Sequence, residues 1–188
     1  MRFKKNEENP LFAISPARCF ETLFTLRTLK GKITARSCML KDQLGVEEGE
    51  GLIYGALDEK GLLFHIAADL SHEGDGVEIF LDTRPGTSAI IGRFCHRFVF
   101  DGDFREETPF RTPEESHPLC DPKLLKWEGN GDGVTLHLPK EAICGFRSGL
   151  FGFALRLRTK GKVQHLGVSA REGGFENHPA QWAQLGIE

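Results

Sequence analysis

Residues 74–84 join a turn, a strand and several polar groups in the order Gly74-Asp75-Gly76-Val77-Glu78-Ile79-Phe80-Leu81-Asp82-Thr83-Arg84. Two glycines around an aspartate supply positive φ angles and side-chain hydrogen bonds to the backbone, which are typical of a turn. The β-branched and aromatic residues that follow predict a strand from about Val77. Alternation sends Val77, Ile79 and Leu81 to one face, and Glu78, Phe80 and Asp82 to the other. The first face is expected to be core, and the second is a candidate binding face.

Short alternating segments lie on both sides of this strand, separated by turn signals. Residues 52–57 and 61–68 form the clearest hairpin, and residues 150–158 and 163–168 form another. A third hairpin is expected from residues 20–27 and 33–40. Further strands are expected at 90–100, 124–127 and 134–138, and one helical turn at 139–144. About ten short strands at this spacing predict an all-β fold, a single antiparallel, jelly-roll-like β-sandwich with little helix.

The length of the chain, 188 residues, fits a single domain. Such a domain would bury about 70% of the surface that its unfolded chain exposes, enough for a core. Residues 1–18 contain two prolines and mixed charges, so we expect an N-terminal leader that crosses the surface and can be partly disordered. Residues 19–188 are expected to form the β-sandwich domain.

The charge and hydropathy of the chain exclude two classes of partner. A net charge of -3 and scattered Lys and Arg residues give no attraction to nucleic acid or to an anionic membrane. No apolar stretch has the length of a signal peptide or of the roughly 18 residues that span a membrane. We expect a cytoplasmic protein, with non-classical export left open. The five cysteines include no CxxC pair, so reduced thiols are expected rather than disulfides.

The stretch 93–100, Arg-Phe-Cys-His-Arg-Phe-Val-Phe, predicts a second strand with one apolar face. Alternation places three phenylalanines and His96 on that face, and Arg93, Cys95, Arg97 and Val99 on the other. Because a face of phenyl rings must leave water, we expect it to be core. The side chains expected to be buried are Val77, Ile79, Leu81, Phe94, Phe98, Phe100, Phe151 and Phe153.

Residues 101–121 show no strand pattern. They contain three prolines and many charges, too polar for a strand and too broken for a helix. Loops of about twenty residues are uncommon in a compact domain unless they cover a surface, bind or are disordered. Phe104, Phe110 and Leu119 can tether this segment, so we expect it to lie across the face of Glu78 or along the sheet edge beside it.

Zinc-type ligands do not complete a site in the sequence. Cys95 and His96 are neighbours on a strand and point to opposite faces, so both cannot bind one ion. Cys95 is therefore expected to be structural. His117 and Cys120 supply two ligands, which is half a zinc site, and the other histidines show no partnered spacing.

Three acids crowd the turn before residues 76–84. Oxygen ligands from Asp69, Glu73 and Asp75 could hold a calcium ion, and they are the candidate metal ligands. A solvated acidic turn explains the same residues. No other cofactor is expected.

An enzyme is the least supported class of function. Glu78 and Asp82 lie four residues apart on one strand, roughly 13 Å, which exceeds the ~5 to 9.5 Å that separates the carboxylates of glycosidases. The sequence shows no Ser-His-Asp order, phosphate-binding loop or dinucleotide fingerprint.

Several motifs together resemble one family of β-sandwiches. They are Gly-Leu-Leu-Phe-His-Ile-Ala-Ala-Asp at 61–69, residues 74–84, residues 93–100, Val-Thr-Leu-His-Leu-Pro-Lys-Glu-Ala at 134–142, and Pro-Ala-Gln-Trp-Ala at 179–183. The chain resembles the family 9 carbohydrate-binding modules and the wider DOMON-like sandwiches over residues 52–185. Residues 93–100 resemble a bacterial subgroup of unknown role. Fold transfers across such a resemblance better than function does.

The resemblance implies a sugar site on the face of Glu78. Glu78 would accept hydrogen bonds from sugar hydroxyls, and Arg97 on the neighbouring strand would donate them. His72 stands where sugar-binding members place a stacking Trp, and Asp82 completes the candidate ligand-binding residues. The same arrangement of Glu78 and Arg97 is also explained by a cross-strand ion pair on a solvated face, worth under about 1 kcal/mol.

Two hypotheses of function remain from the sequence. The first is a non-catalytic carbohydrate-binding module with a saccharide ligand. The second is a protein-interaction or scaffold sandwich, with a patch around Arg93, Arg97, Arg105 and Arg111. The two tryptophans, Trp127 and Trp182, could be ligand platforms, but we expect both in the core. The oligomeric state is left open.

Overall fold

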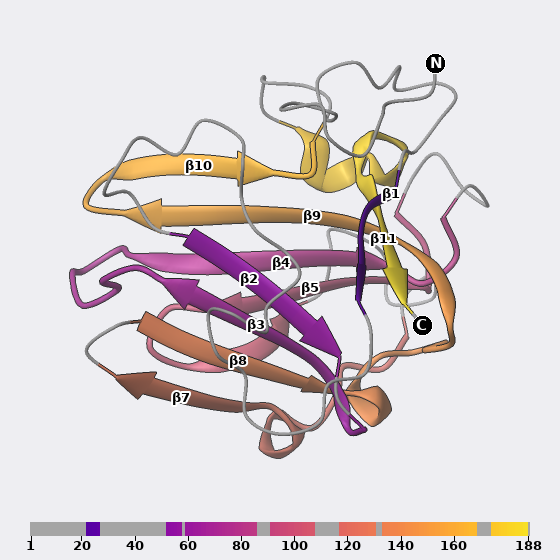
Figure 1. Ribbon diagram of the computed structural model, residues 1–188, viewed down its shortest axis with the longest axis horizontal. Coiled ribbons are helices and arrows are strands. Elements are labelled where there is room, and N and C mark those ends of the chain that lie inside the picture. The colour runs from indigo at the N-terminus through magenta and orange to yellow at the C-terminus, as the bar shows by residue number, and fades with distance from the viewer. Residues whose placement is uncertain are drawn as a thin grey trace.

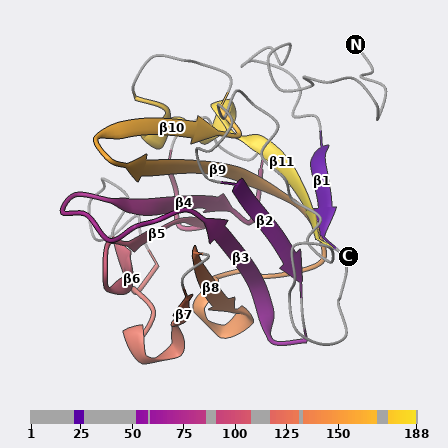
Figure 2. The same cartoon turned by 60° about the vertical axis from the view of Figure 1, so that its left-hand side comes forward.

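The protein is a β-sandwich of two sheets in a computed structural model that describes residues 22–26, 52–57, 59–85, 91–107, 117–130, 133–168 and 174–187. Figure 1 and Figure 2 show the sheets as separate layers. The larger sheet has seven strands in the order β1-β11-β9-β4-β5-β6, with β10 paired to β9; the smaller has four, in the order β2-β3-β8-β7. The predicted all-β sandwich is confirmed.

The strands of the larger sheet are β1 (Thr22–Leu26), β4 (Gly76–Asp82), β5 (Cys95–Phe100), β6 (Phe104–Glu107), β9 (Gly149–Thr159), β10 (Lys162–Leu166) and β11 (Ala183–Ile187). Those of the smaller sheet are β2 (Leu52–Leu57), β3 (Gly61–Ala67), β7 (Lys126–Asn130) and β8 (Gly133–Pro139). The short 3-10 turns among the described residues are η3 (Pro122–Leu124), η4 (Lys140–Ala142), η5 (Phe175–Asn177) and η6 (Pro179–Gln181). Within the described residues, no helix is long and apolar enough to cross a membrane.

The predicted hairpins at 52–68 and 150–168 are present as β2–β3 and β9–β10. The strand expected at 33–40 lies outside the described residues, as do the whole leader, residues 1–18, and the segment 108–116. Strand β1 pairs in parallel with β11, and the other pairings are antiparallel.

Strand β4 lies between β5 and β9, and all seven of its residues are buried. The glycines before and at its start behave as expected: Gly74 has a φ of 86°, and a Cβ on Gly76 would lie 2.5 Å from the carbonyl oxygen of Phe100. Val77, Ile79 and Leu81 face the smaller sheet in the main core. The two sheets meet there through stacked rings, Phe64 of β3 on Phe153 of β9, whose centroids are 5.6 Å apart.

The outer face of β4 is covered by a second apolar cluster. Phe80 contacts Phe175 and Trp182, with ring centroids 5.3 and 5.7 Å away. The fully buried indole of Trp182 donates its Nε1–H to the Phe175 carbonyl at 2.8 Å, as a buried polar group requires. Cys95 is buried in the same cluster. Trp182 is therefore a core residue and Cys95 a structural one, as expected.

Two expectations about the third quarter of the chain are wrong. Residues 104–107 are not loop: they form β6, which pairs with β5 as the edge of the larger sheet. Their charges are tolerated because they bind partners on both faces of the sheet. Phe94 is only half-buried, because β5 begins one residue later. Its ring lies between the guanidinium groups of Arg84 and Arg93, 5.0 and 5.3 Å from its centroid.

The stacked pair between the sheets gives a stability prediction. Phe153→Ala should lower the free energy of unfolding by about 3 to 5 kcal/mol, because it removes a ring that holds both sheets together and leaves a cavity. Val163→Ala, at an exposed position of β10, is the matched control and should change it by less than about 0.5 kcal/mol. Denaturant unfolding measures both. Equal, small losses would show that the faces of β9 are inverted.

Candidate functional site

A row of alternating charges crosses the outer face of the larger sheet. We call it the charged row; its residues are Arg156 and Arg158 on β9, Glu78 on β4, Arg97 on β5, and Arg105 and Glu107 on β6. The registers set it, because Glu78 lies opposite Arg156 of β9, and Arg97 lies opposite Glu107 of β6. Alternation puts these side chains on the face that also carries Phe80.

Glu78 is the centre of the charged row and is only 2% exposed. Its Oε2 accepts hydrogen bonds from Arg97 Nε at 2.9 Å and lies 2.7 Å from Arg97 Nη2. Arg156 Nη1 donates to Oε1 at 3.1 Å, and Arg158 Nη2 binds the same oxygen. Burial alone would raise the pKa of Glu78, but the charges of Arg97 and Arg156 and the hydrogen bond from Arg97 hold this pKa below its ordinary value. Glu78 is thus a carboxylate surrounded by guanidinium groups.

The structure brings Glu78 and Arg97 together, as the sequence predicted, but as a buried ion pair. A carboxylate offers about four lone-pair positions, and the guanidinium groups occupy them. Arg156 also binds Glu176 and lies 5.1 Å over the ring of Phe175, which ties the row to the C-terminal segment. Neither arginine of β9 was singled out from the sequence. The alternation of β9 puts both arginines on one face. The sequence does not reveal that this face adjoins Glu78, because β9 and β4 are far apart in the chain.

Asp82 and His72 do not join the charged row through the contacts observed. Asp82 is buried at the far end of β4, where its Oδ1 accepts the backbone N–H of Arg84 at 2.8 Å. Burial raises the pKa of Asp82 above its ordinary value. His72 is exposed in the turn before β4, and its Nδ1 lies 3.4 Å from Oδ2 of Asp75.

The three calcium candidates form a hydrogen-bonded turn. Asp75 is buried, and its two carboxylate oxygens accept the backbone N–H groups of Lys160 at 2.6 Å and His72 at 3.2 Å. It therefore links the β3–β4 and β9–β10 turns. Asp69 and Glu73 are exposed. Over the described ranges, these three acids do not converge as a set of metal ligands.

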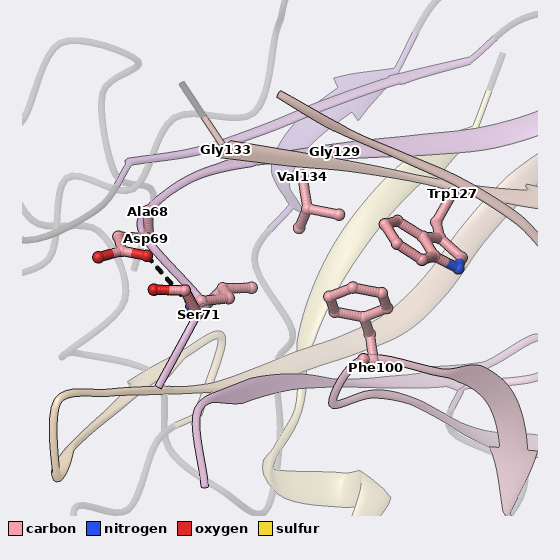
Figure 3. Close-up of a pocket in the computed structure, with 10 residues that line it drawn as sticks. Ala68, Asp69, Ser71, Phe100, Trp127, Gly129, Gly133 and Val134 are labelled. Atoms are coloured by element: carbon pink, nitrogen blue, oxygen red, sulfur yellow. Dashed lines mark hydrogen bonds between the residues drawn. The ribbon is translucent and has the colours of Figure 1, made fainter. Parts of the chain in front are cut away.

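An open hollow lies at one end of the sandwich, beside Trp127 of β7 (Figure 3). Its volume is about 330 Å³, and its walls are Ala68, Asp69, Leu70, Ser71, Phe100, Gly102, Trp127, Gly129, Gly133 and Val134. Figure 3 shows Trp127 and Phe100 on one side of the hollow, Asp69 and Ser71 on the other, and Val134 between them.

Trp127 is 46% exposed, so the expectation that it belongs to the core is wrong. It lies opposite the buried Leu136, on the core side of the smaller sheet, but β7 is the end strand of that sheet as described. One side of its ring packs edge-on against Phe100, with centroids 5.1 Å apart, and the ring lies over Gly129, where a Cβ would come within 3.3 Å. The remaining surface of the indole faces solvent.

A third polar cluster is buried inside the sandwich at the β5–β6 edge. Oε1 of Glu106 lies 2.7 Å from Nδ1 of His96 and 2.6 Å from Nε2 of His117. Burial alone would raise the pKa of Glu106, but its contacts with the imidazoles of His117 and His96 lower this pKa to about 2. The sequence did not predict that these three residues meet. Glu106 lay in an expected loop, and His117 had no histidine partner at a recognisable spacing. The one signal was His96 on a phenyl face.

Neither a protein-family model nor a curated protein sequence matches the chain. Among solved structures, it is similar to family 9 carbohydrate-binding modules from Caldicellulosiruptor kristjanssonii. The structure in complex with glucose has a TM-score of 0.50 at 11% identity, covering 74% of this chain and 76% of that chain. The structure in complex with cellotriose has a TM-score of 0.47 at 12% identity, covering 74% and 75%. The resemblance inferred from the sequence is thus confirmed at the level of the fold.

The pairing of Glu78 gives a prediction for acid stability. Glu78→Gln should lower the free energy of unfolding at pH 7 by about 3 kcal/mol, because it leaves the guanidinium groups without a counter-charge. Since the pKa of Glu78 is lowered on folding, its contribution is present above the ordinary value of 4.5 and is lost as the pH falls through the folded value. The difference between wild type and variant should therefore shrink below pH 4.5.

Urea unfolding between pH 7 and pH 2.5 measures this difference. Glu73→Gln, which removes an exposed acid, is the control and should cost less than about 0.5 kcal/mol at every pH. A difference between wild type and Glu78→Gln that stays constant with pH would mean that folding does not change the pKa of Glu78.

Proposed function

We propose that this protein is a non-catalytic carbohydrate-binding module and that the sugar lies in the hollow beside Trp127. The exposed indole in this hollow is the observation that carries the proposal. The C–H faces of a pyranose ring stack on aromatic rings, and Trp offers the largest such surface among the side chains. The sandwich has the fold of modules solved with sugars, one of them with glucose.

The other walls of the hollow suit the polar groups of a sugar. Across from Trp127, the Asp69 carboxylate and the Ser71 hydroxyl can exchange hydrogen bonds with ring hydroxyls. Asp69 Oδ1 accepts the backbone N–H of Ser71 at 3.1 Å, which fixes the orientation of the carboxylate. The volume, about 330 Å³, lies near the lower end of the ~300 to 1,000 Å³ of small-ligand pockets, which favours one or two sugar rings over a long glycan.

Asp69 is the only carboxylate that lines the hollow in the part of the chain described. Hydrolysis of a glycosidic bond generally requires two carboxylates that flank the bond. The hollow therefore favours binding over cleavage.

The charged row is the second candidate position for a sugar. The family resemblance implies that Glu78 and Arg97 of this row bind the sugar, together with His72 and Asp82. Arg97 and Arg156 keep part of their surfaces in solvent and could donate hydrogen bonds to hydroxyls. The hollow is favoured because the acceptor oxygens of Glu78 already bind guanidinium groups, whereas the face of Trp127 is open.

The alternative function, a protein-interaction sandwich with an arginine-rich patch, is less favoured by the described contacts. Arg105 binds Asp101 and Glu107, and Arg97 binds Glu78 and Glu107. These pairs neutralise two of the four cations that the patch would offer to an acidic partner. Arg111 lies outside the described residues.

Trp127→Ala tests the proposed sugar site. It should weaken binding of glucose or cello-oligosaccharides at least tenfold, about 1.4 kcal/mol, because the stacking surface is lost. Trp127→Phe should retain part of the affinity. Val163→Ala, on β10, is the control and should bind as wild type does. Isothermal titration calorimetry and two-dimensional NMR titration of the full chain measure these affinities.

Three outcomes of this titration decide the proposal. Loss in Trp127→Ala with retention in Glu78→Gln supports the hollow. Loss in Glu78→Gln with retention in Trp127→Ala moves the sugar to the charged row. Absence of binding across a glycan array, for a folded wild-type protein, overturns the carbohydrate function and leaves the protein-interaction alternative.

A further inference from the structure

Three metal-ligating side chains from different parts of the chain converge in the protein interior. His96 lies on β5, Glu106 on β6, and His117 in the segment before η3. Their side chains are 0%, 0% and 4% exposed. One ligand atom from each lies within 4.8 Å of the other two, and this is the only such group in the parts of the chain described.

The second nitrogen of each imidazole faces a backbone carbonyl. His117 Nδ1 lies 2.8 Å from the oxygen of Arg93, and His96 Nε2 lies 3.3 Å from the oxygen of Cys144. A carbonyl oxygen only accepts hydrogen bonds, so these nitrogens carry the proton in a neutral imidazole. The nitrogens that face Glu106 are then the ones with a free lone pair. This is the arrangement of histidines that bind metals, whose outer N–H is held by a carbonyl or carboxylate.

Two lone-pair nitrogens and a carboxylate oxygen repel one another unless a cation lies between them. Protons can supply that charge, but protonating both rings would bury a net positive charge with ring centroids only 4.1 Å apart. Protonating His117 alone, and moving the proton of His96 to Nδ1, leaves His96 Nε2 facing the Cys144 carbonyl without a hydrogen. A divalent metal ion satisfies all three ligand atoms and keeps both outer hydrogen bonds.

We propose that His96, Glu106 and His117 bind a zinc-type transition-metal ion, with the thiolate of Cys120 as the fourth ligand. Nitrogen and sulfur donors select Zn²⁺ over Ca²⁺ or Mg²⁺, which prefer oxygen alone. Cys120 is next to this group: its backbone N–H donates to Glu106 Oε2 at 2.8 Å, and its sulfur, which lies outside the three converging ligand atoms, would move toward the ion on binding. Zinc bonds of about 2.0 Å place tetrahedral ligand atoms about 3.3 Å apart, so the contacts of 2.6 and 2.7 Å would open by about 0.6 Å on binding.

A closed, buried site of this kind is structural. It would join the edge strand β6 to the segment 117–120, which has no regular secondary structure. In the sequence, His117 and Cys120 are only half a site, and the fold supplies the other half from β5 and β6. This site shares no residue with the hollow beside Trp127, so it stands or falls independently of the carbohydrate proposal.

Metal titration of the full chain tests the proposal. Protein stripped with a chelator should take up one equivalent of Zn²⁺, measured by elemental analysis, and its melting temperature should rise. Co²⁺ should give the absorption bands of a tetrahedral site, with a thiolate charge-transfer band in the near ultraviolet. Cys120→Ser should lose that band while keeping weaker binding.

Matched variants separate the buried cluster from the protein surface. Glu106→Gln, which keeps the shape of the side chain, and His117→Ala should each weaken Zn²⁺ binding at least 100-fold, with folding checked by circular dichroism. His72→Ala removes an exposed histidine and should bind as wild type does. Wild-type affinity in Glu106→Gln and His117→Ala overturns the assignment. So does a stripped protein that is folded, takes up no Zn²⁺ or Co²⁺ and melts at the same temperature with or without them; the cluster is then bridged by protons.

Discussion

Strand β4 is buried on both of its faces, and this constraint shapes the rest of the sandwich. Its inner face meets the smaller sheet through aliphatic side chains, as any sandwich requires. Its outer face must also leave water, and it carries Phe80 and two acids. The apolar part is covered by the C-terminal segment through Phe175 and Trp182. The acidic part cannot be covered by apolar groups, since an unpaired buried charge is costly, so β5 and β9 supply arginines around Glu78.

Three of the buried carboxylates, those of Glu78, Glu106 and Asp75, have different kinds of partner. Glu78 binds guanidinium groups, Glu106 binds two imidazoles, and Asp75 binds backbone N–H groups. The guanidinium groups are always charged, so Glu78 stays an anion whose ion pairs link β4 to β5 and β9. Imidazoles can lose a proton and bind a metal ion instead. Among these three carboxylates, only Glu106 therefore has neighbours that can bind a metal ion with it. Asp75 needs no counter-ion, because amide dipoles from two turns satisfy it.

This division explains where a ligand can enter. The charged row is internally satisfied, so an incoming sugar would have to compete with ion pairs already formed. The hollow beside Trp127 lies at the end of the smaller sheet, where β7 is the last strand among the described residues and no further described strand covers the indole. Removing an exposed aromatic surface from water is favourable in free energy, and stacking on a sugar ring adds to this. Binding at the hollow therefore leaves the ion pairs that hold the larger sheet undisturbed.

Residue patterns are enough to predict the strands whose signals are local. The alternation of residues 77–82, the hairpins β2–β3 and β9–β10, and the burial of Trp182 follow from side-chain period and turn chemistry, which act within a few residues. Glu78 and Arg97 were paired correctly, because neighbouring strands were inferred from the family resemblance.

The remaining features emerge only in the folded chain, because they depend on residues that are distant in sequence. Arg156 meets Glu78 across 78 positions, and His117 meets Glu106 across eleven that include prolines. Glu106 looked like loop because its charge argues against a strand, until two buried imidazoles compensate it. Trp127 looked like core because indoles usually are, and only its place on an end strand leaves half of it in water. Period and propensity fix which face a side chain takes, whereas sheet order fixes what that face meets.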